Sequence, residues 1–211
     1  MYLYYVGYIF TLNTTMLDLE GRFLVSKPTM RDARFRESVI LVVEHSRSHS
    51  VGLIINKPVS TPSPQDIGKD FNITSIKRQP NQYVFYGGPT NLNKVMVIHT
   101  PDMEFGAGTH KFNDEIWVSN TPECLRSVME HGYTGPTNWM LCIGQCTWTS
   151  GQLEAEILSR NGRINSDAWL TTTADANVVF GMKYRNRWKK TTNRIAKEMF
   201  QRTFNHALQT Q

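Results

Sequence analysis

Glu44 and His45 place a carboxylate beside an imidazole, a pairing that general acid–base catalysis uses. Histidine titrates near neutral pH, so such a pair could exchange a proton under physiological conditions. The surrounding sequence is strand-like, however, and successive side chains of a strand point to opposite faces. The spacing alone therefore does not bring both groups into one pocket, and a hydrogen-bonded or surface role is the competing interpretation.

Cys146 is the best candidate for a reactive thiol, because it precedes a helix expected from Ser150 and a helix N-terminus lowers the pKa of a nearby thiol. No histidine adjoins it in sequence, so a core thiol is the competing interpretation. Cys142 and Cys146 are separated by three residues, and no histidine pair at zinc-finger spacing follows them. Together with Cys124 they indicate reduced, mostly buried thiols, and we predict no disulfide framework, metal site or cofactor.

The segment from Leu141 to Leu158 combines an apolar run that ends at Gly144, a loop that carries Trp148, and an amphipathic helix from residue 150 to about 160. Thr149 and Gln152 have the spacing of a capping box. Such a junction can present a helix N-terminus to an anion, or it can serve the structure alone. It lacks the Gly-x4-Gly-Lys-Ser/Thr pattern of a P-loop, so we do not expect it to bind nucleotides.

Two further motifs lie where strands are expected to end. Asn56-Lys57 follows an apolar run, and the competing interpretation is a turn in which Asn56 bonds its neighbouring backbone. Gly87-Gly88 separates two expected strands, and glycine permits positive φ. With the groups above, the ligand-facing candidates are Glu44, His45, Asn56, Lys57, Gly87, Gly88, Trp148 and Gln152.

Positive charge is concentrated at the end of the chain. The 211 residues carry a formal net charge of +5, but residues 183–202 alone carry +7, which leaves the remainder at −2. Tyr184 and Trp188 lie among these cations, and phosphate contacts combined with aromatic stacking are one mode of nucleic-acid binding. A solvated helix face is the competing interpretation. The residues that would contact nucleic acid are Lys183, Arg185, Arg187, Lys189, Lys190 and Arg194.

Residues 1–15 contain no charged side chain, and the first ten are apolar and aromatic. The apolar stretch is shorter than the ~20 residues of a membrane span. It also lacks the basic start and cleavage site of a secretory signal. We predict an extension outside the fold, with Met16 as an alternative natural start, and no transmembrane segment. An interfacial anchor is the competing interpretation.

Apolar periodicity predicts more strands than helices. Val39–Val43 and Val51–Ile55 are expected to form an antiparallel hairpin. Further strands are expected at 23–26, 83–86, 95–99, 116–119, 139–143, 169–171 and 178–180, with a loop over 100–113. Helices are expected near 65–70, from a Thr121 N-cap to Gly132, and over roughly 187–208. This pattern favours an α+β fold.

Several sequence blocks, in their order and spacing, resemble the AlgH/YqgE family of bacterial proteins. The most specific are Gly52 to Pro58, Gly87-Gly88-Pro89, and Gly144 to Ile157 with Trp148 within it. The family usually has glycine at the position of Thr147 and proline at that of Ser150. The resemblance implies a bifurcated, largely antiparallel sheet that forms a pseudo-barrel flanked by helices. It also implies a cytoplasmic bacterial protein with a proposed role in transcriptional regulation and no established reaction.

We therefore expect an AlgH/YqgE-like domain over residues 16–182 and a basic C-terminal helix over 183–211. The expected function is that of a non-enzymatic binding or regulatory protein with a protein or small-molecule partner. Two alternatives stay open. One is a small hydrolase or transferase with a shallow site near Glu44/His45, Asn56 and Trp148, and the other is nucleic-acid binding through the C-terminal helix.

Overall fold

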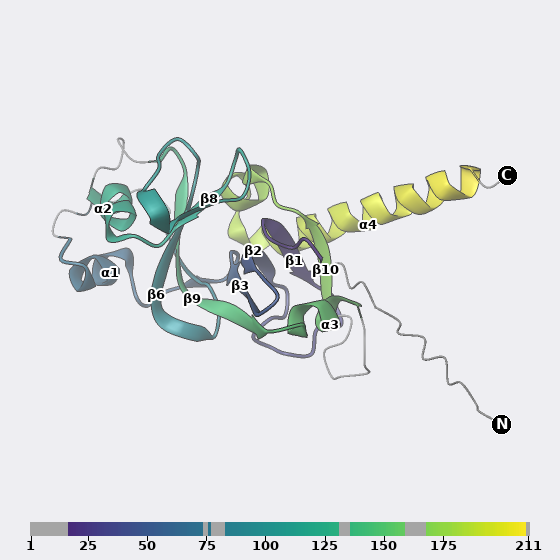
Figure 1. Cartoon of the computed structure of the whole chain (residues 1–211), viewed down its shortest axis with the longest axis horizontal. Helices are drawn as coiled ribbons and strands as arrows, with labels where there is room; N and C mark the ends of the chain where they lie inside the picture. Colours follow the sequence, from purple (N-terminus) through teal and green to yellow (C-terminus); the bar gives the residue numbers. More distant parts are fainter. Residues whose placement is uncertain (1–16, 74–75, 77–82, 131–135, 159–167, 210–211) are drawn as a thin grey trace, which may run out of the picture.

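The protein is built on a curved, largely antiparallel sheet with helices packed on its faces (Figure 1). The computed structural model describes residues 17–73, 76, 83–130, 136–158 and 168–209. Within these residues the strand order is β10-β1-β2-β3-β9-β6-β8-β7, and β5 pairs with both β4 and β9. The predicted α+β class with a bifurcated sheet is thereby confirmed. The extension predicted over residues 1–15 lies outside the described residues.

The strands and helices of the described residues have the following bounds. The strands are β1 (Arg22–Ser26), β2 (Val39–His45), β3 (His49–Ile54), β4 (Pro58–Val59), β5 (Val84–Tyr86), β6 (Thr90–His99), β7 (Thr109–Lys111), β8 (Trp117–Ser119), β9 (Trp139–Thr149) and β10 (Trp169–Thr173). The helices are α1 (Pro64–Asp70), α2 (Pro122–Glu130), α3 (Gln152–Leu158) and α4 (Tyr184–Gln209), with a 3-10 turn η1 (Gly106–Gly108) and a π-helical turn η2 (Asn177–Gly181).

The sheet divides at β9, which takes part in both halves. One edge of β9 pairs antiparallel with β6 over most of its length. The other edge changes partner, because residues 141–143 pair with the parallel strand β5 and residues 146–149 pair with the antiparallel strand β3. The fork therefore lies at Gly144.

Three glycines let the backbones approach closely at this fork. A Cβ atom on Gly87 would lie 2.2 Å from the carbonyl oxygen of Gly144, and one on Gly88 would lie 2.2 Å from the backbone of β9. Gly144 has a φ of +73°, a conformation that favours glycine. Gly87 accepts a hydrogen bond from the Ile54 amide and donates one to the Ile143 carbonyl, so it links the two branches.

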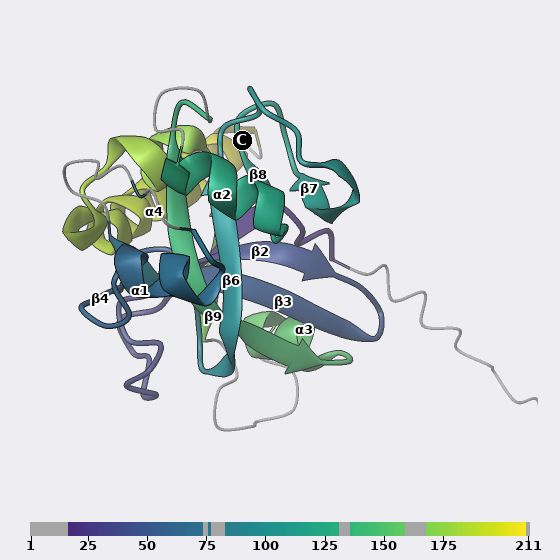
Figure 2. The same ribbon diagram turned by 90° about the vertical axis from the view of Figure 1, so that its left-hand side faces the viewer.

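Apolar side chains fill both faces of the sheet. The continuous apolar run of β2 is buried on both sides, as its sequence predicts. One face of β1, β2 and β3 packs against η2 and the first half of α4, and the other packs against α3 together with Trp148 and Trp169. Helices α1 and α2 cover the part of the sheet made by β5, β6 and β9 (Figure 2).

Three predicted elements differ from the structure. The strand predicted to stop at residue 143 continues to Thr149, because its second half pairs with the distant strand β3, so Trp148 lies on a strand and not in a loop. Residues 178–180 are not a strand but part of η2. There the side chain of Asp175 accepts a hydrogen bond from the Val178 amide, a local bond that competes with strand pairing. The predicted loop over 100–113 contains η1 and β7.

Helix ends follow local chemistry more closely. The hydroxyl of Thr121 accepts a hydrogen bond from the Cys124 amide at 3.2 Å, so the predicted N-cap of α2 is confirmed. Helix α3 begins at Gln152, two residues after the predicted start. The side-chain oxygen of Gln152 accepts a hydrogen bond from the Thr149 amide at 3.0 Å, as capping-box spacing predicts.

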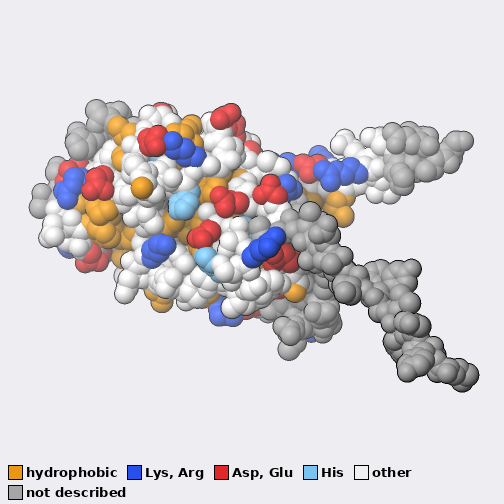
Figure 3. Space-filling model, viewed as in Figure 1, with side chains coloured by type: hydrophobic (Ala, Val, Ile, Leu, Met, Phe, Trp, Pro, Cys, Tyr) orange, Lys and Arg blue, Asp and Glu red, His pale blue; other side chains and the backbone are white. Residues whose placement is uncertain are grey.

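Helix α4 begins at Tyr184 and projects beyond the rest of the protein at its C-terminal end (Figure 1). Ile195 is buried against the sheet, as predicted, whereas Met199, predicted on the same stripe, is 56% exposed. On the face seen in Figure 3, acidic and basic side chains are interspersed over the body of the molecule. None of the described helices is both long and apolar enough to cross a bilayer.

Candidate functional site

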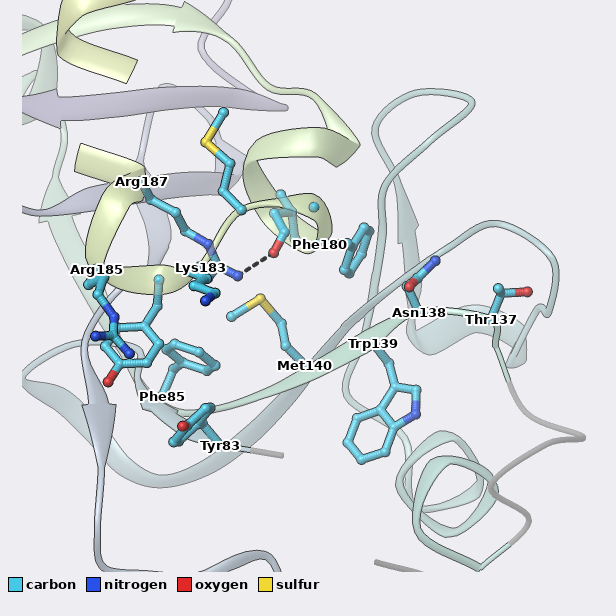
Figure 4. Close-up of a pocket in the computed structure, with 14 residues that line it drawn as sticks. Tyr83, Phe85, Thr137, Asn138, Trp139, Met140, Phe180, Lys183, Arg185 and Arg187 are labelled. Carbon is cyan, nitrogen blue, oxygen red and sulfur yellow. Dashed lines mark hydrogen bonds between the residues drawn. The ribbon is translucent and has the colours of Figure 1, made fainter. Parts of the chain in front are cut away.

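A cavity of about 460 Å³ lies between the start of α4, the turn η2 and the strands β5 and β9 (Figure 4). We call it the α4 cavity. Its volume falls within the roughly 300–1,000 Å³ that is common for small-molecule sites. The lining side chains used below are Tyr83, Phe85, Met140, Lys183, Tyr184, Arg185 and Arg187.

Arg187 supplies a buried positive charge to this cavity. The residue is 6% exposed, and its guanidinium donates hydrogen bonds to the carbonyl oxygens of Ile55 and Val179. Its Nε atom is buried, and among the described residues it has no hydrogen-bond partner and no carboxylate forms an ion pair with the guanidinium. Burial lowers the pKa of Arg187 to about 10, so the group stays cationic at neutral pH. A buried charge without a counter-charge is costly, and an anion in the cavity would compensate it.

Two further cations stand at the mouth of the cavity. Lys183 and Arg185 are exposed, and Figure 4 shows Lys183 and Arg187 directed toward the space above Met140. No aspartate or glutamate occurs among the described lining residues or in the first turn of α4. The N-terminal end of a helix also carries partial positive charge. All the charged side chains of the described lining are therefore positive.

Aromatic rings form one wall. The ring of Tyr184 meets that of Tyr83 at a centroid distance of 5.2 Å and that of Phe85 at 6.2 Å, both edge-on. The guanidinium carbon of Arg187 lies 5.4 Å from the Phe85 ring centroid. Such a wall offers apolar surface and stacking faces beside the cations.

The described lining residues include no histidine, cysteine, serine or carboxylate, the groups that most often serve as general bases or nucleophiles. Across the described part of the chain, no three histidine, cysteine or acidic residues gather in a way that could hold a metal ion. The arrangement suits the binding of an anion that carries an apolar or aromatic group.

Glu44 and His45 have separate partners, as expected for neighbours on a strand. Glu44 pairs with His49 at 2.9 Å on the exposed side. His45 is 8% exposed, with Nδ1 2.8 Å from the Ser50 hydroxyl and Nε2 3.5 Å from the Glu154 carboxylate. Serine, histidine and carboxylate in contact match the components of a nucleophilic triad. Ser50 is only 2% exposed, however, so a substrate cannot reach its hydroxyl.

Trp148 and Gln152 belong to a cluster around Glu156. One carboxylate oxygen of Glu156 accepts hydrogen bonds from the indole nitrogens of Trp148 at 3.0 Å and Trp169 at 2.9 Å. The other accepts one from the Gln152 side chain at 3.0 Å. Trp148 and Trp169 are 5% and 3% exposed. Their contacts fix α3 and β10 against β9.

Asn56 and Lys57 bind backbone of the first residue of β2 and of the segment before it. Asn56 accepts a hydrogen bond from the Val39 amide at 2.9 Å and donates one to the Glu37 carbonyl at 2.8 Å. The predicted bond of Asn56 to its neighbouring backbone is therefore replaced by bonds to residues 17 and 19 positions away. Lys57 donates to the carbonyl of Arg34 at 2.7 Å.

These residues do not converge on one site. Asn56 lies at the Val39 end of β2 and His45 at the other, roughly 20 Å apart at 3.3 Å per residue. Trp148 lies near the His45 end of β2, because Ser50 on β3 is opposite His45 on one side and opposite Trp148 on the other. The shallow enzymatic site considered from the sequence was placed near Glu44/His45, Asn56 and Trp148, and in the structure Asn56 lies at the opposite end of β2 from the other two.

Cys146 lies within β9, six residues before the start of α3, so it is not at the helix N-terminus itself. It is 1% exposed, and its thiol donates to the carbonyl oxygen of Gly87 at 3.4 Å. Burial raises the pKa of the Cys146 thiol well above its usual range, so the reactive thiolate is disfavoured. Gly87 and Gly88 themselves are buried at the fork of the sheet.

The cations of the C-terminal helix divide into bound and free groups. Arg187 is buried, and Arg194 pairs with Asp175 at 2.5 Å, so neither is free to contact nucleic acid as predicted. The ring of Trp188 is partly buried, and its nitrogen donates to the Ser26 carbonyl at 2.8 Å. Those left exposed from the predicted set are Lys183, Arg185, Lys189 and Lys190.

The lining residues Tyr83, Phe85 and Met140 were missed from the sequence, because the fold brings them together from separate segments. Arg187 carried one usable signal. It precedes the buried Thr191 and Ile195 by four and eight residues, so all three lie on one side of the helix. A cation on a buried helix face indicates a special environment.

Comparison with known proteins identifies similar chains. An AlgH-like family model matches residues 23–199. A UPF0301 protein of Yersinia pestis is 29% identical over 188 residues, which cover 87% of this chain and 95% of the relative. A UPF0301 protein of Blochmanniella floridana is 30% identical over 187 residues, which cover 87% and 92%.

Two solved structures share the fold. The solution structure of the AlgH protein from Pseudomonas aeruginosa has a TM-score of 0.65 and 25% identity, covering 86% of this chain and 90% of that one. The crystal structure of a protein from Corynebacterium diphtheriae has a TM-score of 0.64 and 20% identity, covering 84% and 87%.

Proposed function

Because the chain belongs to the AlgH-like family, which has no established reaction, we propose from its own geometry that it is a binding protein for an anionic small molecule. The ligand would occupy the α4 cavity with its anionic group near Arg187 and an apolar or aromatic part against Tyr83, Phe85 and Tyr184. The observation that carries the proposal is the buried guanidinium of Arg187, which has no carboxylate partner among the described residues.

The same geometry supports a non-enzymatic role, since the described lining contains no histidine, cysteine, serine or carboxylate. A cytoplasmic sensor of an anionic metabolite, acting in regulation and including the regulation of transcription, is the role that we propose. The hydrolase or transferase alternative has less support, because its residues lie at two ends of β2.

Fluorescence titration with 8-anilinonaphthalene-1-sulfonate, an aromatic anion, tests the cavity directly. The neutral N-phenyl-1-naphthylamine serves as its uncharged counterpart. We expect the anion to bind, and the double variant K183Q/R185Q to weaken it about three- to tenfold, because each exposed cation contributes a modest solvent-screened attraction. Binding of the neutral probe should change little.

The matched control is K189Q/K190Q, which removes the same charge from exposed positions of the same helix outside the cavity. Equal anion affinity in K183Q/R185Q and this control would contradict the proposal. To identify the natural ligand, protein purified from its host would be denatured and the released small molecules measured by mass spectrometry. An anionic compound enriched with wild type over K183Q/R185Q is the expected result.

A further inference from the structure

Helix α4 carries a row of exposed residues that runs along its solvent side onto the half that projects from the protein (Figure 1). Lys189, Asn193, Lys197, Phe200 and Phe204 follow one another at spacings of four, four, three and four residues. Such spacings place side chains along one side of a helix. All five are exposed. We call them the α4 outer row.

The row lies opposite the side of α4 that packs on the sheet. Thr191 and Ile195, the buried side chains in this part of the helix, are two residues from Asn193, which is about 200° around the helix axis. The row is therefore free of the contacts that hold α4 in place. Its residues can be changed without opening the core.

Phe200 and Phe204 present two nearly parallel rings to solvent. They are 72% and 55% exposed, with ring centroids 6.4 Å apart and planes at 14° to each other. At ~200 Å² for each side chain, they expose roughly 250 Å² of apolar surface. A stable pairing with a second copy buries about 800 Å² per partner. The two rings are too small for that, but they suit stacking against planar groups.

The rest of the row is cationic. Lys189 and Lys197, and Lys190 beside them, form no ion pair with any described residue. Glu198, the acidic residue of this helix, lies near Arg194 at 3.8 Å. The row from Lys189 to Phe204 is about 22 Å long at 1.5 Å per residue. Its apolar part is confined to one end, whereas a helix that inserts into a membrane surface has an apolar face along its length.

Proteins that bind single-stranded nucleic acid combine cations that contact the phosphate backbone with aromatic rings on which the bases stack. We propose that the α4 outer row binds single-stranded nucleic acid, with Lys189 and Lys197 on phosphates and Phe200 and Phe204 on bases. The stacking residues are thus different from Tyr184 and Trp188, which the fold uses internally. This site is separate from the α4 cavity.

Fluorescence anisotropy with a 5′-labelled, mixed-sequence 20-nucleotide DNA and its RNA counterpart tests the proposal on the full chain. The double variant F200A/F204A should bind at least about tenfold more weakly, because each lost stacking contact is substantial. Its salt dependence should stay the same. The variant K189Q/K197Q should instead reduce the slope of log affinity against log salt by about 1.4, at 0.7 per phosphate contact.

Arg202 supplies the matched control, because it is an exposed cation on the same projecting stretch but on the other side of the helix. R202Q should leave ring stacking unchanged and alter the salt slope less than K197Q. Circular dichroism melts should show all variants folded like wild type, since every changed side chain is exposed.

The proposal is overturned if neither oligonucleotide binds at 50 mM salt, or if R202Q matches K197Q in its effect. It is also overturned if F200A/F204A binds both oligonucleotides like wild type while losing binding to phosphatidylserine-containing vesicles. A concentration-dependent dimer that F200A/F204A abolishes, without oligonucleotide binding, would assign the row to self-association instead.

Discussion

Replacing Glu156 by leucine should destabilise the protein, because it removes the hydrogen-bond acceptor that two buried indoles share. The substitution leaves the indole N–H groups of Trp148 and Trp169 without their acceptor, although both rings stay 95% or more buried. An unsatisfied buried donor costs about 1–3 kcal/mol, so two cost about 2–6 kcal/mol. Glu156 is partly exposed and admits some water, which places the expected loss at about 2–4 kcal/mol.

Glutamine at position 156 keeps an oxygen for the two indoles but removes the charge. Because hydrogen bonds to charged groups are about twice as strong as neutral ones, E156Q should cost about 1–2 kcal/mol. The matched control is E154L, which removes another carboxylate from the same helix. Among the described residues, the Glu154 carboxylate contacts the His45 ring, at 3.5 Å. An isolated, partly exposed pair of this kind contributes up to about 1 kcal/mol.

Urea unfolding at pH 7, followed by tryptophan fluorescence, gives the free energy of unfolding for each variant. The order of stability should be wild type, then E154L and E156Q, then E156L. A loss below about 1 kcal/mol in E156L, or one equal to that in E154L, would show that the indoles find other acceptors and would refute the reasoning.

Three further predictions concern stability. Gly88→Ala should reduce the free energy of unfolding by more than about 3 kcal/mol, because the new methyl would lie 2.2 Å from the backbone of β9. Gly151→Ala should cost only about 1–2 kcal/mol, because its φ is +67° but nothing lies within 4 Å of the new methyl. Equal thermal melting points for the two variants would contradict this. Asn56→Ala removes two long-range hydrogen bonds and should cost about 1–3 kcal/mol in urea unfolding, and an unchanged midpoint would argue against their importance. Burial lowers the pKa of His99 from 6.5, so the unfolded chain takes up its proton first as the pH falls. The free energy of unfolding of the wild type should therefore be highest above about pH 6.5 and decline toward pH 5. His99→Gln should show a smaller decline. Parallel curves of unfolding free energy against pH would exclude His99 as the source.

The sequence predicted those elements whose signals are local. The β2–β3 hairpin and the Thr121 cap of α2 rest on neighbouring residues, and both were found. The second half of β9 was missed, because its strand character comes from pairing with β3, almost one hundred residues earlier. The family resemblance, not local pattern, led to the fork in the sheet.

The candidate site was harder to predict for the same reason. Its cations are visible in the sequence, but only the spacing of Arg187 from Thr191 and Ile195 indicates that the helix buries it while leaving the neighbouring lysines exposed. The rings of Tyr83 and Phe85 reach Tyr184 only through the packing of β5 against α4, about one hundred residues apart. Conversely, Trp148 and Gln152 belong to a distinctive sequence motif, but in the structure both donate hydrogen bonds to the Glu156 carboxylate.

The sharing of β9 between two sets of partners has a consequence for how the protein opens. Since residues 141–143 and 146–149 belong to one uninterrupted strand, neither branch can lose its hydrogen bonds without disturbing the other. Native-state hydrogen exchange should therefore find a single cooperative unit in which amides of β3, β5 and β6 share nearly the same opening free energy.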